Sequence, residues 1–214
     1  MHSHPPAADP KSKPNASSSR APRGPDWWLM MRAFWKKGRS IASFAPSSRF
    51  MARSVVKGID FEAARCIVEL GAGTGPITAE LARRVRPHTK LLVIELDPDL
   101  CARLKNRFPQ VDVVQGDAAQ FDKLLADRGY SQVDHVCSGL PLPSFPAQLR
   151  DSILATSARM LAPGGTFRQL TVMPLIYYRM YSGYFNDVRF KFVPLNIPPG
   201  GVYVCRGYRE SQVG

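Results

Sequence analysis

The sequence predicts an α/β fold in which a mostly parallel sheet is covered by helices on both faces. Two observations carry this prediction. Short apolar runs typical of buried strands alternate with helical patterns from residue 59 onward, and a glycine-rich turn directly follows the first of these runs. Alternation of this kind gives a doubly wound sheet with parallel strands. Ligands of such sheets bind beyond the carboxyl ends of the strands.

The chain opens with a tail and a basic segment. Residues 1–25 are rich in Pro, Ser and Ala and are expected to be disordered. Residues 26–58 form a basic amphipathic segment that "FAPSSR" is expected to interrupt, and residues 59–214 form the folded domain. Between residues 27 and 57 there are seven Lys or Arg and no acid, and all three tryptophans of the chain lie there. Read as a helix, residues 27–37 have aromatic side chains on one side and cations on the other.

This basic segment admits two interpretations. Aromatic side chains flanked by cations are typical of a helix that lies in the plane of a membrane interface, and the stretch is too short to span a bilayer. Alternatively, the aromatic side chains dock on the domain as a lid over a bound ligand. The candidate membrane or substrate contacts are Trp27, Trp28, Arg32, Trp35, Lys36, Lys37, Arg39, Ser48 and Arg49.

The amino-acid composition limits the classes of partner and of metal or redox chemistry that this chain can have. A net charge of +12 over 214 residues favours an anionic partner, either nucleic acid or a membrane surface, over a basic surface that serves only solubility. No secretory signal opens the chain, and no apolar run approaches the ~20 residues that cross a bilayer. The four cysteines show no CxxC pair and no metal-ligand spacing. We therefore expect buried, reduced thiols and no metal site.

The elements of the domain follow in order. "ARCIVELGAGTGPITAELARRV" predicts a strand, a loop and a helix, and "KLLVIELDP" predicts a second strand that leads into a helix. "VDVVQGDA" and "VDHVCSGLPL" predict the third and fourth strands, with His135 packed in the sheet rather than catalytic. A helix over residues 147–162 ends at "PGG". "TFRQLTVM" and "GVYVCRGYR" are strands on either side of a short aromatic helix in "IYYRMYSGYF".

Three features at consecutive strand ends predict one ligand site. Gly71, Gly73 and Gly75 allow the backbone to turn sharply and approach a ligand. The dinucleotide fingerprint GxGxxG would need glycine at the position of Pro76, which disfavours NAD. An acidic residue, Glu95, ends the second strand about 20 residues later, the spacing at which a carboxylate accepts ribose hydroxyls. A second acidic residue, at position 117, follows the third strand.

At these residues the chain resembles a known family. "VELGAGTGPIT", "IELDP" and "GDAAQF" resemble motifs I, II and III of class I S-adenosylmethionine-dependent methyltransferases, over residues 67–206. The resemblance implies a Rossmann-like, seven-stranded, mostly parallel sheet whose last strand is reversed. It also implies S-adenosylmethionine as cofactor and S-adenosylhomocysteine as product. The implied cofactor contacts are Glu69, Gly71, Ala72, Gly73, Thr74, Gly75, Glu95, Leu96, Asp117, Ala118 and Ser138.

The resemblance also assigns parts of the cofactor to these positions. The methionine moiety would lie against Glu69, Gly71 and Gly73, the ribose against Glu95, and the adenine against Asp117 and its neighbour Ala118. A lipid-binding module without catalysis is disfavoured, because both acidic residues that would hold the nucleoside are present.

Motif IV, which faces the reactive methyl group, separates two further resemblances. RNA adenine dimethylases are similar to this chain through motifs I to III, but methylases of adenine amino groups carry "NPPY", "DPPY" or "NLPY" where this chain has "SGLPL". The RNA adenine dimethylases also append a helical RNA-binding domain, for which few residues follow "TVMP". A nucleic-acid adenine N6-methylase therefore remains the alternative function.

"SGLPL", "FAPSSRFMAR" and "NIPPGGVYV" together resemble the Rhodobacter-type phosphatidylethanolamine N-methyltransferases. This implies stepwise methylation of a phospholipid amine toward phosphatidylcholine, with Ser138, Gly139 and Leu140 as the catalytic turn. Two departures, Gly200 for alanine and "RQLTVMP" for a "QFTY"-like stretch, bear on substrate specificity.

Three tyrosines lie in the short aromatic helix near the C-terminus. Tyr177, Tyr178 and Tyr181 either face a methylated ammonium through cation–π contacts or pack in the core. We expect a monomer, peripheral on the inner face of the cytoplasmic membrane. Its expected partners are an anionic lipid surface and a phospholipid substrate, and no nucleic acid.

Overall fold

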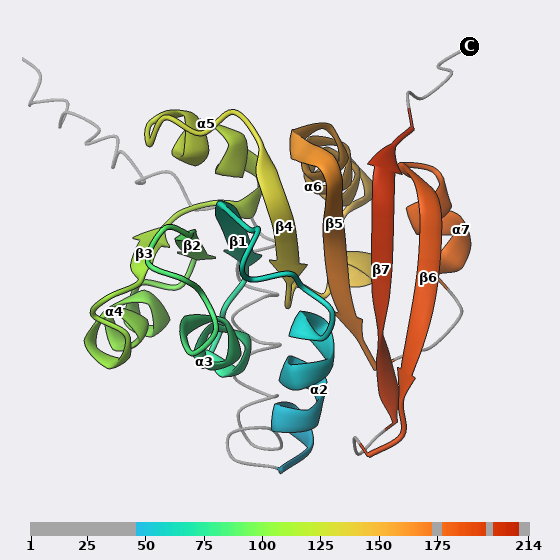
Figure 1. Ribbon diagram of the computed structural model, residues 1–214. Helices are drawn as coiled ribbons and strands as arrows, with labels where there is room; N and C mark the ends of the chain where they lie inside the picture. The colour runs from blue at the N-terminus through green and yellow to red at the C-terminus, as the bar shows by residue number, and fades with distance from the viewer. Residues whose placement is uncertain (1–45, 173–176, 196–198, 210–214) are drawn as a thin grey trace, which may run out of the picture.

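A computed structural model describes residues 46–172, 177–195 and 199–209, and their strands form one seven-stranded sheet (Figure 1). The strand order is β3-β2-β1-β4-β5-β7-β6. Strands β1 to β5 pair in parallel, and β7 runs antiparallel to both β5 and β6. The predicted fold with a reversed last strand is therefore confirmed. The strands are β1 Cys66–Leu70, β2 Lys90–Glu95, β3 Asp112–Gln115, β4 Val133–Ser138, β5 Leu161–Thr171, β6 Phe185–Val193 and β7 Gly200–Tyr208.

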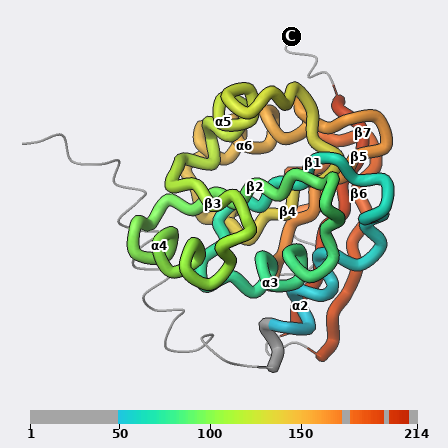
Figure 2. The backbone as a smooth tube through the Cα atoms, turned by 60° about the vertical axis from the view of Figure 1, so that its left-hand side comes forward, coloured from blue at the N-terminus to red at the C-terminus, as the bar shows by residue number. Residues whose placement is uncertain are grey.

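Helices cover both faces of the sheet (Figures 1 and 2). On one face α2, α3 and α4 bury one apolar layer, and on the other α5, α6 and α7 bury a second. None of the helices within the described ranges is both long and apolar enough to cross a membrane. The helices are α2 Pro46–Val56, α3 Pro76–Ala82, α4 Pro98–Arg107, α5 Phe121–Ala126, α6 Ala147–Met160 and α7 Tyr178–Ser182, with short 3-10 turns η1 Ala118–Gln120 and η2 Leu142–Ser144.

Three elements differ from the sequence-based expectation. The "PSSR" stretch, expected to interrupt the basic segment, is instead the first turn of α2, which begins at Pro46. Proline suits the first turn of a helix because its missing N–H has no intrahelical partner there. Strand β5 begins directly after α6 and so contains the "PGG" expected to lie between them, with a register shift against β4. Strand β6 was not predicted from its own residues, because only part of this edge strand is buried.

A buried arginine fixes α2 against the sheet. Arg168 of β5 is 1% exposed, and its guanidinium donates to the carbonyls of Val55 at 3.0 Å, Lys57 at 2.9 Å and Gly58 at 3.2 Å. The last carbonyls of a helix have no intrahelical partner, so these bonds satisfy the C-terminal end of α2. The guanidinium thus holds the C-terminal part of the basic segment against β5.

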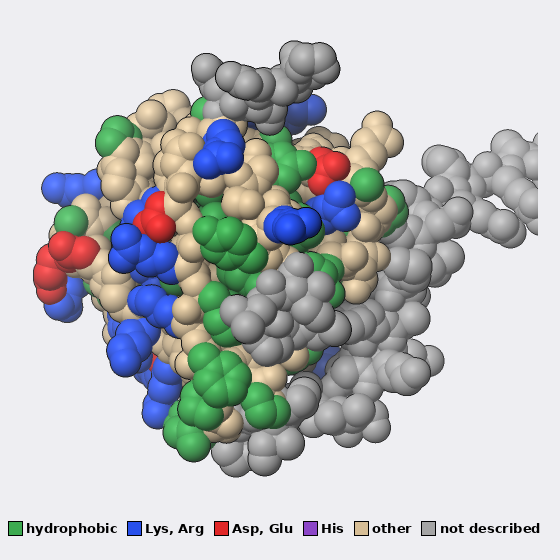
Figure 3. Space-filling view, turned by 90° about the vertical axis from the view of Figure 1, so that its right-hand side faces the viewer, with side chains coloured by type: hydrophobic (Ala, Val, Ile, Leu, Met, Phe, Trp, Pro, Cys, Tyr) green, Lys and Arg blue, Asp and Glu red, His purple; other side chains and the backbone are tan. Residues whose placement is uncertain are grey.

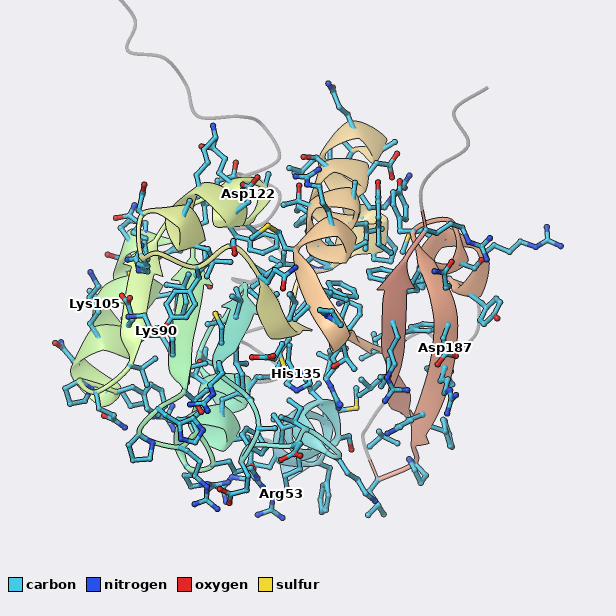
Figure 4. The ribbon with its side chains drawn as sticks, turned by 45° about the horizontal axis from the view of Figure 1, so that its top comes forward. Arg53, Lys90, Lys105, Asp122, His135 and Asp187 are labelled. Carbon is cyan, nitrogen blue, oxygen red and sulfur yellow. The ribbon has the colours of Figure 1, made fainter. Side chains whose placement is uncertain are left out.

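His135 belongs to the same buried network (Figure 4). Its Nδ1 lies 2.8 Å from the hydroxyl of Thr166, which also accepts a hydrogen bond from Nε of Arg168. Burial, together with the nearby guanidinium charge, lowers the pKa of His135 to about 4. It is therefore a neutral, packed residue at physiological pH, as expected. The four cysteines are also buried and unpaired, which agrees with the sequence-based expectation.

Candidate active site

The carboxyl ends of β1 to β4 and the segments that follow them surround a pocket. Six of the predicted site residues line it, and four further residues that the sequence did not single out complete the lining. The remaining predicted residues of motifs I and IV lie in the adjoining strand end and loops. The predicted lining residues are Gly71, Glu95, Leu96, Asp117, Ala118 and Leu140, and the others are Ile94, Gly116, Phe145 and Ile153.

The glycine-rich loop after β1 forms one wall of the pocket. Gly71, Gly73 and Gly75 all have positive φ, at 69°, 59° and 83°. A Cβ at Gly71 would also lie 2.3 Å from Cδ2 of Leu140. Only glycine combines this backbone conformation with such close packing. The glycine-rich loop is thus packed directly against the motif IV turn. Ala72 and Thr74 are the other two residues of this loop.

Glu95 ties the end of β2 to this loop. Its Oε2 accepts a hydrogen bond from the N–H of Gly73 at 2.7 Å, and its Oε1 accepts one from the N–H of Asp97 at 3.0 Å. The side chain is 2% exposed, and burial raises its pKa despite these bonds. Glu95 therefore lines the pocket and also holds the glycine-rich loop in place through its hydrogen bond with Gly73.

Glu69 lies beside the loop with one oxygen unsatisfied. It is fully buried, and its Oε2 accepts a hydrogen bond from the hydroxyl of Thr78 at 2.7 Å. Its Oε1 has no hydrogen-bond partner among the described residues. Burial, with a smaller contribution from the charge of Glu95, raises the pKa of Glu69 to about 8. An unpaired buried carboxyl oxygen is a position where a donor on a ligand would be stabilised.

The raised pKa of Glu69 predicts a pH dependence of stability in the cofactor-free protein. Above pH 4.5 the unfolded chain releases a proton that the folded protein keeps until about pH 8. Folding stability therefore falls as the pH rises toward 8. Between pH 6.5 and 8, Glu69→Gln should lose roughly 1–2 kcal/mol less stability than the parent. Titration of His135 contributes little between pH 6.5 and 8, because burial lowers its pKa from the ordinary 6.5 to about 4 in the folded protein.

Urea denaturation at several pH values measures this difference. Glu62→Gln, a change at an exposed carboxylate paired with Arg86, is the matched control and should follow the parent. Stability curves for Glu69→Gln and the parent that run parallel from pH 6.5 to 8 would show that Glu69 is already ionised in the folded protein.

Asp117 and Ala118 close the pocket at the end of β3. The Oδ1 of Asp117 accepts a hydrogen bond from the N–H of Ala119 at 2.9 Å and so caps η1. Ala118 is 9% exposed. The carboxylate of Asp117 lines the pocket while one of its oxygens holds the turn.

The motif IV turn is held from three sides. The hydroxyl of Ser138 accepts a hydrogen bond from the N–H of Leu140 at 3.3 Å, and the N–H of Gly139 donates to the carbonyl of Leu70 at 3.0 Å. The side-chain amide of Gln169 on β5 donates to the carbonyl of Leu140 at 2.8 Å. These bonds fix the turn beside the glycine-rich loop.

The aromatic residues of α7 do not act as a group. Tyr181 is fully buried, and its ring centroid lies 4.7 Å from that of Tyr203 and 6.3 Å from that of Phe167. The core-packing alternative therefore holds for Tyr181. Tyr177 is half-buried and Tyr178 is exposed.

The basic segment is only partly described. The predicted contacts from Trp27 to Arg39 lie outside the described residues, as does the side chain of Ser48, whereas Arg49 is exposed on α2. Among the described residues no group of three or more His, Cys, Asp or Glu gathers in a way that suits a metal ion.

Comparison with known proteins identifies the family. The model of a family described as "Methyltransferase domain" matches residues 67–165. An ornithine lipid N-methyltransferase from Singulisphaera acidiphila is 47% identical over 189 residues, which cover 87% of this chain and 98% of that protein. A probable ribosomal RNA small subunit methyltransferase A from Methanosarcina acetivorans is 34% identical over 116 residues, but these cover 50% of this chain and 42% of that protein.

Solved structures agree on the fold. A 1,6-didemethyltoxoflavin-N1-methyltransferase from Burkholderia thailandensis, solved with S-adenosylhomocysteine, has a TM-score of 0.66 at 16% identity over 92% of this chain and all of that one. The 16S rRNA N2 G1207 methyltransferase of T. thermophilus, solved with S-adenosylmethionine and guanosine, has a TM-score of 0.58 at 19% identity, over 78% of this chain and 44% of that one. The chain belongs to the class I S-adenosylmethionine-dependent methyltransferases.

Proposed function

We propose that this protein transfers a methyl group from S-adenosylmethionine to the amine of a membrane lipid headgroup. The observation that carries the proposal is the 47% identity to the Singulisphaera ornithine lipid N-methyltransferase over almost the whole of both chains. Ornithine lipid is therefore the first candidate substrate. Phosphatidylethanolamine is the second, because "SGLPL" and "NIPPGGVYV" resemble the phosphatidylethanolamine enzymes.

The residues around the pocket suit the cofactor. The unpaired buried Oε1 of Glu69 can accept a hydrogen bond from the methionine ammonium. Glu95 would hold the ribose hydroxyls, and Asp117 with Ala118 would contact the adenine. Ile153 and Phe145 add apolar surface for the ring. When bound, S-adenosylmethionine supplies an electrophilic methyl group, whose bonding electron pair remains on the sulfur.

The chain's own contribution is alignment and exclusion of water. An alkylammonium titrates near ~10, as lysine does, and only the neutral amine has the lone pair that attacks. Leu140 and Phe145 are buried at motif IV and give the pocket an apolar wall. An amine desolvated beside such a wall loses its proton more readily. Holding the neutral amine in line with the methyl group lowers the barrier without any covalent step on the protein.

We also propose that the enzyme works on an anionic lipid surface. Four exposed apolar side chains are carried by segments that approach Gly200, where β5, β7 and α2 meet and which pairs with Val193 of β6. A Cβ at Gly200 would lie 2.6 Å from the carbonyl oxygen of Thr171 and 2.9 Å from Cε of Met51, which shows how closely these elements approach. The exposed side chains adjoin this junction, and we call them the apolar rim: Phe50, Val172, Phe192 and Leu195, which are 37%, 52%, 57% and 66% exposed.

Exposed cations accompany the apolar rim. Arg49 and Arg53 lie on α2 and Lys191 lies on β6, all exposed. Figure 3 shows hydrophobic side chains at the lower end of this face and a column of Lys and Arg beside them. Apolar and basic side chains together suit an interface with anionic lipid, since insertion and charge reinforce each other. The basic segment 26–58, which ends in α2, would add its tryptophans to the same surface.

Labelled S-adenosylmethionine offered with separate acceptor pools tests the function. The pools are anionic vesicles with ornithine lipid, the same vesicles with phosphatidylethanolamine, ribosomal RNA, and DNA. Label is expected in the lipid extract of the ornithine lipid pool. Label in the RNA pool and in neither lipid pool would favour the RNA methylase alternative, which the partial similarity to the Methanosarcina protein motivates.

A further inference from the structure

Gln169 has a buried amide whose bonding is incomplete. It lies near the carboxyl end of β5 beside Ser138, the last residue of β4, and is 1% exposed. Its Nε2 donates to the carbonyls of Leu140 and Leu170, both at 2.8 Å. No hydrogen-bond donor among the described residues reaches its Oε1.

The two bonds of Nε2 fix which way the amide faces. Rotating the amide by 180° would place Oε1 against two carbonyl oxygens, and neither could donate to it. The acceptor atom is therefore oriented as well as buried. A buried acceptor without a donor costs about 1–3 kcal/mol, so it calls for a partner that arrives with a ligand.

The position of this acceptor fits the methyl-accepting substrate. The cofactor pocket spans the ends of β1 to β4, so the substrate must approach the methyl group from an adjoining strand end. Gln169 is on the next strand of the sheet, and its amide holds the carbonyl of Leu140, which lines the pocket. On its other side Gln169 pairs with Tyr203 of β7, whose ring packs on that of Tyr181.

We propose that Oε1 of Gln169 accepts a hydrogen bond from an N–H of the substrate amine and thereby selects headgroups that still carry an N–H. This inference rests on the proposed lipid N-methyltransferase function. A neutral primary or singly methylated amine offers an N–H to the amide, whereas a neutral dimethylated amine and a trimethylated ammonium offer none. The same contact turns the nitrogen lone pair away from Gln169, toward the methyl group. The contact is therefore lost once the nitrogen carries two methyl groups.

The test measures lipid binding in a complex that cannot react. Water-soluble, short-chain ornithine lipid in its primary, N-methyl and N,N,N-trimethyl forms is titrated calorimetrically into protein saturated with S-adenosylhomocysteine. The phosphatidylethanolamine series replaces it if the parent methylates that lipid instead. Gln169→Met should weaken binding of the primary and N-methyl lipids by about 10-fold or more, the equivalent of one hydrogen bond. It should weaken binding of the trimethyl lipid by less than about 3-fold.

Two further variants separate selection from structural support. Gln169→Glu loses the bonds from Nε2 but keeps an acceptor, so it should retain the preference for lipids that carry an N–H. This variant also tests the inference if Gln169→Met fails to fold. Gln132→Met, an exposed glutamine ahead of β4, should bind all three forms like the parent. Equal losses for all three forms in Gln169→Met, or no loss, would overturn the inference. A parent that methylates no lipid would overturn the proposed function instead.

Discussion

Glu95→Ala is expected to weaken S-adenosylmethionine binding by about 100-fold or more. The carboxylate lies at the pocket, and its two oxygens accept hydrogen bonds from Gly73 and Asp97 in the cofactor-free protein. In the complex it would hold the two ribose hydroxyls, and hydrogen bonds to a charged group contribute about 1.5–3 kcal/mol each. Removing the carboxylate also leaves the N–H of Gly73 without its partner, so the loop is no longer held in shape.

Conservative variants separate these two effects. Glu95→Gln keeps one acceptor oxygen and the side-chain shape, so it should lose less affinity than Glu95→Ala. Asp117→Asn keeps an oxygen that can cap η1, so any loss of affinity there reports on contact with the adenine rather than on folding. Isothermal titration calorimetry gives the dissociation constants, and thermal denaturation shows whether each variant is folded. The exposed Glu62→Ala is the control. Parent-like affinity in folded Glu95→Ala would remove Glu95 from the ribose site.

The clustering of the cofactor loop and its acidic residues was predictable because of sheet geometry. Parallel strands end at a common edge, so residues that follow consecutive strands must converge. Gly71, Glu95 and Asp117 are separated by about 20 residues each in sequence, yet they line one pocket. A local pattern of strand, glycine loop and helix was sufficient to find them, since each lies immediately at a strand end.

Residues whose roles depend on distant parts of the chain were not predictable. Phe145 and Ile153 line the pocket, but an apolar residue on a helical pattern reads equally well as core. Arg168 satisfies carbonyls more than 100 positions earlier in the chain, and no local pattern encodes such a pairing. Gln169 left one signal, an uncharged polar side chain within the buried stretch of β5. That signal indicates a hydrogen-bonding role but not its partner.

The substitution at position 200 has a local explanation. Alanine is usual there in the phospholipid methyltransferases that this chain resembles. In this backbone a Cβ at Gly200 would lie 2.6 Å from the carbonyl oxygen of Thr171. This backbone therefore requires glycine at position 200, and an alanine there would fit only if the chain near Thr171 and Met51 moved.

Membrane association should require both the tryptophans and the cations of the basic segment. A single apolar or electrostatic signal rarely holds a protein on a bilayer. Lys36→Glu with Lys37→Glu changes the local charge by four, and each charge near an anionic surface is worth about 1 kcal/mol. This double variant should therefore leave anionic vesicles almost completely, and added salt should release the parent by screening. Trp28→Ala with Trp35→Ala should weaken binding at every salt concentration, since insertion is not electrostatic.

The contribution of the apolar rim to vesicle binding can be tested separately from that of the basic segment. If the apolar rim also enters the bilayer, Phe192→Ser with Leu195→Ser should weaken vesicle binding independently of salt. Tyr208→Ser is the matched control, because Tyr208 is 43% exposed but pairs with Phe185 at the opposite end of the β6–β7 hairpin. Lys105→Glu with Lys123→Glu controls for net charge, since these lysines lie on α4 and α5.

Sedimentation with vesicles measures binding, and tryptophan emission reports which segment inserts. All three tryptophans lie between residues 27 and 35, so a blue shift on adding anionic vesicles reads that segment alone. Neutral vesicles should leave the emission unchanged. If the lysine and tryptophan double variants both sediment with vesicles like the parent while Phe192→Ser with Leu195→Ser does not, the apolar rim alone docks the enzyme. The tryptophan segment would then act as a lid over the site. If all three bind like the parent, the enzyme does not use these surfaces to reach its substrate.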